Sequence, residues 1–219
     1  MKNFNKVTFL ACGLLLTLAA FPVFAQEEKL VGEYEMSRRP LDNLAQLVRR
    51  ETAAGKVDLT KPFSIELEGV LNINGRLDAN KSKFTKTAGD AAMIEVGKSF
   101  IEAVSDSGFL SYLKDFGVEK LNLTLVQDDN QIYAAVIAEI ETSQKAALVS
   151  KSLNSAAERV QAKKDELKNL RNDEKILISG LKASSDGKTL VIKVAYEKSV
   201  IQELINRMLK ESEVKQSSE

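Results

Sequence analysis

A strand, a tight turn, a second strand and an amphipathic helix recur three times along this chain of 219 residues. The three turns lie at Gly75, Asn130 and Gly187, which are 55 and 57 residues apart. Recurrence at a near-constant spacing indicates duplication of one unit, or stacking of such units around a shared sheet. Because each hairpin needs one face covered, we predict an α+β fold with a mainly antiparallel sheet and helices on one face.

The recurrence divides most of the chain into three predicted ββα units, which span residues 61–117, 118–172 and 173–213. A polar lead-in and a first helix precede them in residues 26–60. Residues 214–219 form a polar tail that we expect to be disordered. Without the first and last strands, the predicted order is the ferredoxin-like βαββαβ, with an extra strand at each end.

The first unit carries the clearest local signals. From Ile65 to Ile73 apolar residues occupy alternate positions, which predicts a half-buried strand. Asn74-Gly75 predicts a type I′ turn, which needs positive φ at both central residues. We expect a polar return strand over residues 76–87, and then a helix whose N-cap is Asp90.

Three lysines, Lys81, Lys83 and Lys86, distinguish this return strand. Lysines on an edge strand prevent it from pairing with another chain, so we predict an edge position in the sheet. The alternative role is contact with an anion or a lipid headgroup. The strand expected at residues 132–140 is instead apolar on both faces, which predicts a central position.

Residues 1–25 have the features of a secretory signal peptide. A basic start precedes a nearly continuous apolar run, and small residues end it. We therefore predict export, with cleavage between Ala25 and Gln26. Two alternatives remain: residues 7–25 are just long enough to stay as an inner-membrane anchor, and Cys12 could carry a lipid.

Composition removes several classes of function. The chain has no histidine, and its only cysteine lies in the predicted signal peptide, which excludes Ser-His-Asp and Cys-His nucleophile systems and the usual zinc sites. An exported chain without cysteine cannot use disulfides, which suits a bacterial periplasm. No P-loop is present, and the formal net charge of zero does not favour nucleic acid. We therefore predict no enzymatic activity, cofactor, metal or nucleic-acid partner.

Carboxylates are the remaining candidates for chemistry. Glu66 and Glu68 share one face of a strand, and a carboxylate pair can perform acid–base hydrolysis as in glycosidases. Asp128, Asp129 and Asn130 could offer oxygens to calcium, but the twelve-residue loop with its final Glu is absent. The simpler interpretations are an exposed sheet face and a plain turn.

The densest aromatic patch of the chain contains Phe109, Tyr112 and Phe116, interleaved with Leu110 and Leu113. Core packing is the simpler role for such a patch. The alternative is a surface that contacts a partner, or a pocket beneath the patch that holds a small ligand or a lipid.

The stretch from Glu66 to Leu110 contains a series of short motifs, namely ELEGVL, GRLD, KSKF, GD and IEAVSDSGFL, which begin at Glu66, Gly75, Lys81, Gly89 and Ile101. In these motifs it resembles the TonB C-terminal domain, and in particular exported proteins described as energy transducers of the TonB type. In that family the domain contacts outer-membrane transporters and passes on force from an inner-membrane motor. The resemblance implies the fold and a protein-binding role. Only three prolines occur, so the proline-rich periplasmic span of the family is absent.

From the sequence we predict a non-enzymatic, exported protein, periplasmic or secreted, that binds another envelope or outer-membrane protein. Addition of a strand at an open sheet edge is one mode for such binding. The alternatives are a periplasmic carrier of a small ligand or lipid, a membrane-anchored energy transducer if residues 7–25 are retained, and a hydrolase using Glu66 and Glu68. The pattern does not indicate the strand order, the oligomeric state or the identity of the partner.

Overall fold

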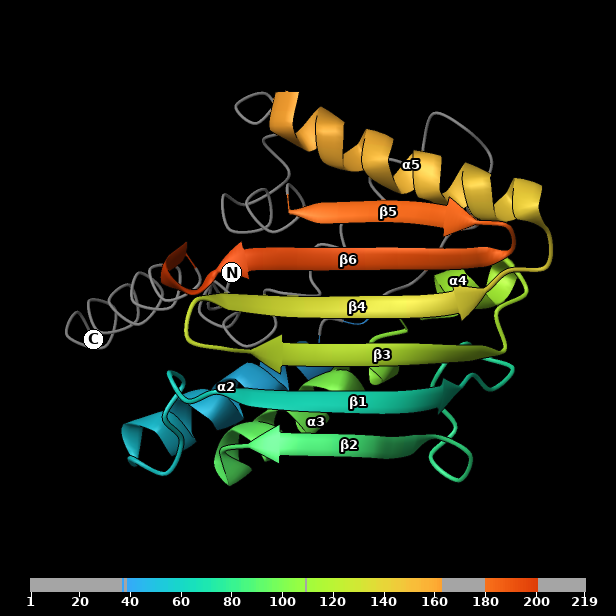
Figure 1. Ribbon diagram of the computed structural model, residues 1–219. Coiled ribbons are helices and arrows are strands. Elements are labelled where there is room, and N and C mark those ends of the chain that lie inside the picture. The colour runs from blue at the N-terminus through green and yellow to red at the C-terminus, as the bar shows by residue number, and fades with distance from the viewer. Residues whose placement is uncertain (1–36, 38, 109, 163–179, 201–219) are drawn as a thin grey trace, which may run out of the picture.

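The computed structural model describes residues 37, 39–108, 110–162 and 180–200. Within them, a six-stranded antiparallel sheet has helices packed on one face, which confirms the predicted α+β class (Figure 1). The predicted signal peptide, its cleavage site at Ala25-Gln26, and most of the closing helix and the tail lie outside the described residues.

The described elements follow the chain in the predicted order. In the sheet the strand order is β2-β1-β3-β4-β6-β5, so three antiparallel pairs lie side by side. The central position predicted for residues 132–140 is confirmed, because β4 lies between β3 and β6. The elements are α2 (Arg39–Ala53), β1 (Phe63–Val70), β2 (Lys83–Gly89), α3 (Ala91–Asp106), α4 (Ser111–Asp115), β3 (Lys120–Gln127), β4 (Gln131–Glu139), α5 (Ser143–Ala162), β5 (Leu181–Asp186) and β6 (Thr189–Glu197).

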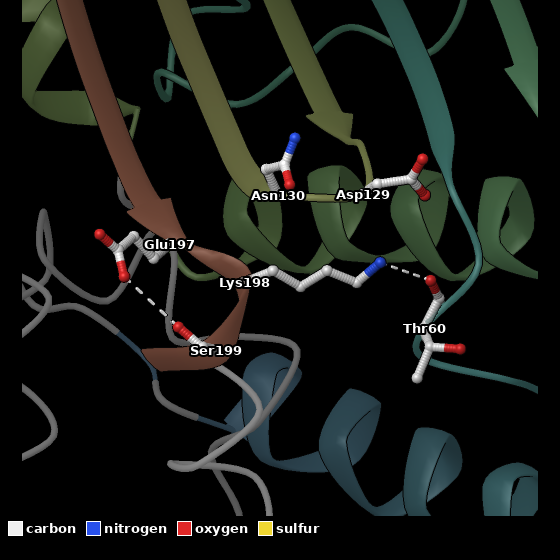
Figure 2. Close-up of a pocket in the computed structure, with 6 residues that line it drawn as sticks. All are labelled: Thr60, Asp129, Asn130, Glu197, Lys198 and Ser199. Atoms are coloured by element: carbon white, nitrogen blue, oxygen red, sulfur yellow. Dashed lines mark hydrogen bonds between the residues drawn. The ribbon is translucent and has the colours of Figure 1, made fainter.

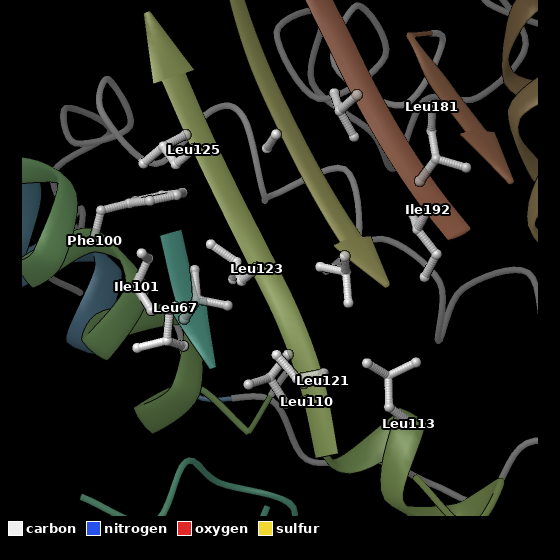
Figure 3. Packing of buried hydrophobic residues seen from close by; sticks show 14 of the residues in the cluster. Leu67, Phe100, Ile101, Leu110, Leu113, Leu121, Leu123, Leu125, Leu181 and Ile192 are labelled. Carbon is white, nitrogen blue, oxygen red and sulfur yellow. The ribbon is translucent and has the colours of Figure 1, made fainter. Parts of the chain in front are cut away.

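One face of the sheet is continuous and apolar. Ile65 of β1 lies opposite Leu125 of β3, and Val136 of β4 lies opposite Ile192 of β6. Phe100 of α3 belongs to the same buried cluster, and Figure 3 shows its ring pointing toward β3 near Leu125. Burial of each large apolar side chain contributes about 1.5–3 kcal/mol. The core therefore lies between this sheet face and the helices.

The helix α3 begins where the sequence predicts. Oδ1 of Asp90 accepts a hydrogen bond from the backbone N–H of Met93 at 3.0 Å, so Asp90 is its N-cap. One turn later, Gly97 lets the helix approach the sheet closely. A Cβ atom at Gly97 would lie 2.5 Å from Cδ1 of Ile65 and 2.8 Å from Cε2 of Phe63, so these side chains would have to shift.

The first turn differs from the predicted type I′ turn. Among the described residues only glycines have positive φ, so Asn74 lacks the conformation that this turn requires. Instead the backbone N–H of Asn72 donates to the carbonyl of Arg76 at 2.8 Å. The side-chain oxygen of Asn72 accepts from the N–H groups of Asn74 and Arg76. This side chain, together with Gly75 at φ +69°, fixes the loop.

The return strand is shorter than the predicted span of residues 76–87. Leu77 forms an isolated bridge with Leu71, and the ladder resumes at Lys83. Between these points a turn intervenes, in which Oδ1 of Asp78 accepts from the backbone N–H of Asn80 at 3.0 Å. The local hydrogen bonds of Asp78 compete with the sheet ladder and interrupt it.

The two edges of the sheet are protected in different ways. At the β5 edge, the side-chain amide of Asn154 in α5 donates to the carbonyl of Ala183 and accepts from its N–H, both at 2.8 Å. The amide thus takes the place of a neighbouring strand. At the other edge, β2 exposes Lys83 and Lys86, and its register shifts at Thr85, which forms a bulge. The predicted edge position of the lysine-bearing strand is confirmed.

Substitution of Asn154 by Ala should lower the free energy of unfolding by about 1–3 kcal/mol, because both backbone groups of Ala183 lose their partner. Urea denaturation measures this loss, and hydrogen exchange at the Ala183 amide should accelerate. Asn80→Ala, in an exposed loop, is the control and should change stability by less than about 0.5 kcal/mol. Unchanged exchange at Ala183 would show that the edge does not depend on Asn154.

Candidate interaction surface

The aromatic patch packs against the core. The rings of Tyr112 and Phe116 contact each other edge to face, with centroids 5.0 Å apart, and both flank the core cluster. Leu110 and Leu113, their neighbours in the chain, are fully buried near Leu121 of β3 (Figure 3). Burial raises the pKa of Tyr112 to about 12. Packing accounts for Tyr112 and Phe116, whereas Phe109 lies outside the described residues.

The carboxylates of Glu66 and Glu68 lie on the sheet face that is turned away from the core. Glu66 is 3.2 Å from Nζ of Lys86, and both side chains are largely exposed. Glu68 lies opposite Lys83 in the register of β1 and β2. Acid and base therefore alternate across two strands at the surface, which is the arrangement of solvated cross-strand pairs. An acid–base pair requires an enclosed site that gives its two carboxylates different environments, whereas these two carboxylates share one open sheet surface.

The acidic turn between β3 and β4 is closed by its own carboxylate. Oδ1 of Asp128 accepts from the backbone N–H groups of Gln131 and Asn130, each at 2.7 Å. These two bonds hold the pKa of Asp128 below its ordinary value. Within the described part of the chain, no cluster of three or more acidic, histidine or cysteine side chains is arranged to hold a metal ion. The turn interpretation thus accounts for Asp128.

A polar hollow of about 570 Å³ lies beside this turn (Figure 2). Its buried member is Lys198, whose Nζ donates to the carbonyl of Thr60 at 2.6 Å and to that of Asp128 at 3.1 Å. The ammonium group therefore ties the end of β6 to the segment before β1. The residues that line the hollow are Thr60, Asp129, Asn130, Glu197, Lys198 and Ser199.

Gln127 makes a second connection to the same segment. Its Nε2 donates to the carbonyls of Leu59 and Lys61, each at 2.8 Å. Gln127 and Lys198 thus bind three successive carbonyls between α2 and β1. In each strand every second residue faces the core, and Gln127 and Lys198 occupy the next inward-facing positions. A polar residue at an inward-facing position needs a hydrogen-bonding partner, and this signal was missed in the sequence. This cluster has a structural role.

The sheet face opposite the core is not crossed by any described helix, as the view in Figure 1 shows. We call it the bare face. Every second residue of each strand points to it, and one row across it consists of Glu66, Thr124, Ala135 and Lys193. Its centre is apolar and half-buried. The side chains at this centre are Val126, which lies opposite Tyr133, and Val191, which lies opposite Ile137.

Ile137 is the most informative of these side chains. Although it is aliphatic and lies on a central strand, it is 41% exposed. Ala135, its neighbour on the bare face, lies between Thr124 and Lys193 in the register and is only 4% exposed. The bare face therefore has a closely packed middle at Ala135 and an exposed aliphatic side chain beside it at Ile137.

Charged side chains of both signs surround this middle. Glu66 and Glu68 of β1 lie opposite Lys86 and Lys83 of β2 on one side, and Lys193 lies on β6 on the other. Lys193 is directly opposite Lys182 of β5, and neither has a carboxylate partner within the residues that the structure describes. Like charges in directly opposite positions destabilise a sheet. The lysine pair therefore costs stability unless an acidic group approaches it.

One end of the bare face is hollowed. The hollow has a volume of about 990 Å³. It lies at the end of the sheet where β1 and β4 end and β3 and β6 begin. Its lining combines apolar Val70 and Ile137 with acidic Glu68 and Glu139 and basic Lys120. An apolar centre inside a polar rim is the anatomy of a protein–protein interface. The mixed charges do not suit an apolar ligand.

Comparisons with protein-family models, with curated proteins and with solved structures each found no match. The function must therefore be inferred from the chemistry of this surface. Within the described ranges, no helix has both the length and the apolar composition that are needed to cross a membrane.

Proposed function

We propose that the protein is a non-catalytic binding protein that contacts another protein of the cell envelope through its bare face. One observation carries the proposal: the described helices cover one side of the sheet, and the other side presents a half-buried apolar centre with charges around it. Large exposed apolar patches with polar rims mark sites of protein interaction. Export to the envelope is the expectation from residues 1–25, and binding is the role implied by the TonB-like stretch.

The bare face is favoured over the sheet edges as the binding surface. Strand addition needs an uninterrupted row of unpaired backbone groups. At β5, Asn154 occupies the backbone groups of Ala183. At β2, the bulge at Thr85 interrupts the ladder and the lysines repel a cationic strand. Both edges thus resist an added strand. Contact through the bare face does not depend on these edges.

A carrier of a small ligand or lipid receives less support from the same residues. Ligand pockets are mostly apolar and enclose their ligand. The hollow of about 990 Å³ is open and is lined by Glu68, Glu139, Lys81, Lys120 and Lys188 among others. Burial of these charges by an apolar ligand would be costly. A polypeptide with complementary polar groups fits the lining better.

The proposal is tested with a photo-crosslinking amino acid at Ile137 in the native host. Leu148 of α5 is a matched control, because its exposure of 39% is close to the 41% of Ile137 but it lies away from the bare face. We expect a discrete crosslinked product from Ile137 and none from Leu148.

The same pair of positions gives a binding test. Ile137→Glu should weaken association with the captured protein by about tenfold or more, which corresponds to about 1.4 kcal/mol, whereas Leu148→Glu should not. Equal crosslinking at both positions, or association that Ile137→Glu leaves intact, would contradict the proposal.

A further inference from the structure

We propose that Asn74 is a site of spontaneous deamidation, and that the packing of its turn against α4 controls the reaction. Asn74 is followed by Gly75. Glycine hinders this reaction least, because it has no Cβ beside the nitrogen that reacts. The modification does not depend on the bare face, and its only co-reactant is water.

The reaction is an intramolecular substitution at the side chain of Asn74. The backbone nitrogen of Gly75 forms a bond to Cγ of Asn74, the bond from Cγ to Nδ2 breaks, and the proton of Gly75 leaves with ammonia. One water molecule then opens the cyclic imide. Cleavage at Cγ gives aspartate. Cleavage at the backbone carbonyl carbon gives isoaspartate, in which the main chain passes through Cβ. No atom is oxidised or reduced.

The side chain of Asn74 is accessible to this chemistry. Asn74 is exposed, and among the residues that the structure describes none bonds to its carboxamide. Asn72, two residues earlier, is half-buried and has a different role. Its side-chain oxygen accepts from the backbone N–H groups of Asn74 and Arg76 at 2.9 and 3.1 Å. The group that leaves from Asn74 therefore faces solvent.

The backbone nitrogen of Gly75 is restrained in the folded turn. Its N–H donates to the carbonyl of Asn72 at 3.0 Å. Gly75 is also buried, and a Cβ atom added to it would lie 2.2 Å from Cα of Ser111 in α4. Ring closure requires this nitrogen to lose its proton and to approach Cγ of Asn74. The docked turn opposes both changes, so the turn must leave α4 before it reacts.

Two tertiary hydrogen bonds at the base of the turn oppose this opening. The backbone N–H of Leu77 donates to Oγ of Ser105 in α3 at 2.8 Å. The backbone N–H of Leu71 donates to the carbonyl of Glu119 at 2.8 Å. A segment held in this way opens locally, without unfolding of the sheet. When reclosing is fast, the deamidation rate is the rate in the unfolded chain multiplied by the fraction of open turns.

Isoaspartate cannot replace Asn74 in the docked turn. It lengthens the main chain by one carbon–carbon bond, about 1.5 Å. Gly75 already touches the backbone of Ser111, so the added length has no room on that side. The N–H groups of residues 74 and 76 must also reach one oxygen of Asn72. The modification is therefore a one-way step: a turn that has opened and formed isoaspartate does not dock again.

Peptide mapping by mass spectrometry measures the deamidation of Asn74 during incubation of the full chain at mildly alkaline pH. In the folded chain Asn74 should react at least about tenfold more slowly than in the same chain unfolded by urea. Asn72→Ala removes the oxygen that holds the turn and should accelerate the folded-state reaction at least about tenfold. Ser105→Ala, which removes the acceptor of the Leu77 N–H, is a second variant with the same expected direction.

Asn154→Ala is the control, because it weakens the β5 edge of the sheet and leaves the turn intact. It should not change the folded-state rate at Asn74. Equal acceleration by Asn154→Ala and Asn72→Ala would show that the reaction follows global unfolding, and it would overturn the inference. Equal rates in the folded and the unfolded chain would overturn it as well, because the docked turn would then give no protection.

The stability of the product tests the one-way step. Electron-transfer fragmentation distinguishes isoaspartate from aspartate, and ion exchange separates the reacted chain by its added negative charge. The isoaspartyl chain should unfold at a lower urea concentration than the unaltered protein. Asn74→Asp adds the same charge without the extra backbone atom, so it should keep the original midpoint. An isoaspartyl chain as stable as the Asn74→Asp variant would show that the turn still docks, which would contradict the proposal.

Discussion

Gly75→Ala is expected to lower the free energy of unfolding by about 3 kcal/mol, although it only replaces a hydrogen atom by a methyl group. A Cβ atom at Gly75 would lie 2.2 Å from Cα and 2.9 Å from N of Ser111, which are backbone atoms that begin α4. The backbone cannot rotate away as a side chain can. The φ angle of +69° adds about 1 kcal/mol for any residue with a Cβ. Equilibrium urea denaturation measures the loss.

Gly187→Ala is the matched control for this substitution. Gly187 also has positive φ, at +55°, but no atom lies within 4 Å of its added Cβ. Its substitution should therefore cost about 1 kcal/mol, the conformational part alone. The difference between the two variants measures the contact between the turn and α4. Equal losses would show that this contact contributes nothing to the stability of the protein.

The turn at Gly75 also shows how far the sequence determines the local structure. The Asn74-Gly75 pair predicts a reversal of the chain, and the reversal is there. The type of turn depends on two features that the pair does not contain. One is the side chain of Asn72, which accepts from two backbone N–H groups, and the other is the close approach of Ser111. Tertiary contacts of this kind override a local preference.

How well each strand could be predicted depended on whether apolar residues alternate along it. In β1, β3 and β6 apolar residues alternate, so the period of two indicates both the strand and its buried face. In β2 only Phe84 is partly buried, so the pattern does not mark where pairing resumes. The order of the three pairs in the sheet depends on how the helices pack over them. Periodicity within one segment does not contain that information.

The bare face illustrates the same limit for the candidate site. Sequence reasoning identified Glu66, Glu68 and the aromatic patch, because clusters of one chemical kind are visible along the chain. Tyr112 and Phe116 of the patch pack against the core, and Glu66 lies on a surface that also contains Lys193, more than one hundred residues away. Only the register of four strands brings these residues into one row. A surface assembled in this way has no signature in a single segment.

Lys198→Met is expected to lower the free energy of unfolding by about 2–4 kcal/mol. Methionine fills a similar volume but has no N–H groups, so the carbonyls of Thr60 and Asp128 lose their charged donor. Each carbonyl left without a donor costs about 1–2 kcal/mol, the lower part of the usual range of about 1–3 kcal/mol, because the adjacent hollow is open to solvent. The segment before β1 would keep only the bonds from Gln127. Equilibrium denaturation at neutral pH measures the loss.

A second measurement separates this role from simple loss of packing. The pKa of Asp128 is lowered first by the N–H groups of Gln131 and Asn130 and, to a smaller extent, by the charge of Lys198. A lowered carboxyl pKa stabilises the fold above its ordinary value of 3.8, and this stabilisation is lost as the pH falls through the folded-state pKa. In the Lys198→Met variant the pKa of Asp128 should rise, and this acid-dependent loss of stability should become smaller.

Lys151→Met in α5 provides the comparison, because that lysine is exposed and its substitution should change stability by less than about 0.5 kcal/mol. If Lys198→Met were as stable as the unaltered protein, water in the adjacent hollow of Figure 2 would have to satisfy both carbonyls. The ammonium group would then be dispensable. If stability falls and the pKa of Asp128 rises together, the charge itself holds three distant segments of the chain in place. That result would explain why a lysine occupies an inward position that an apolar residue would otherwise fill.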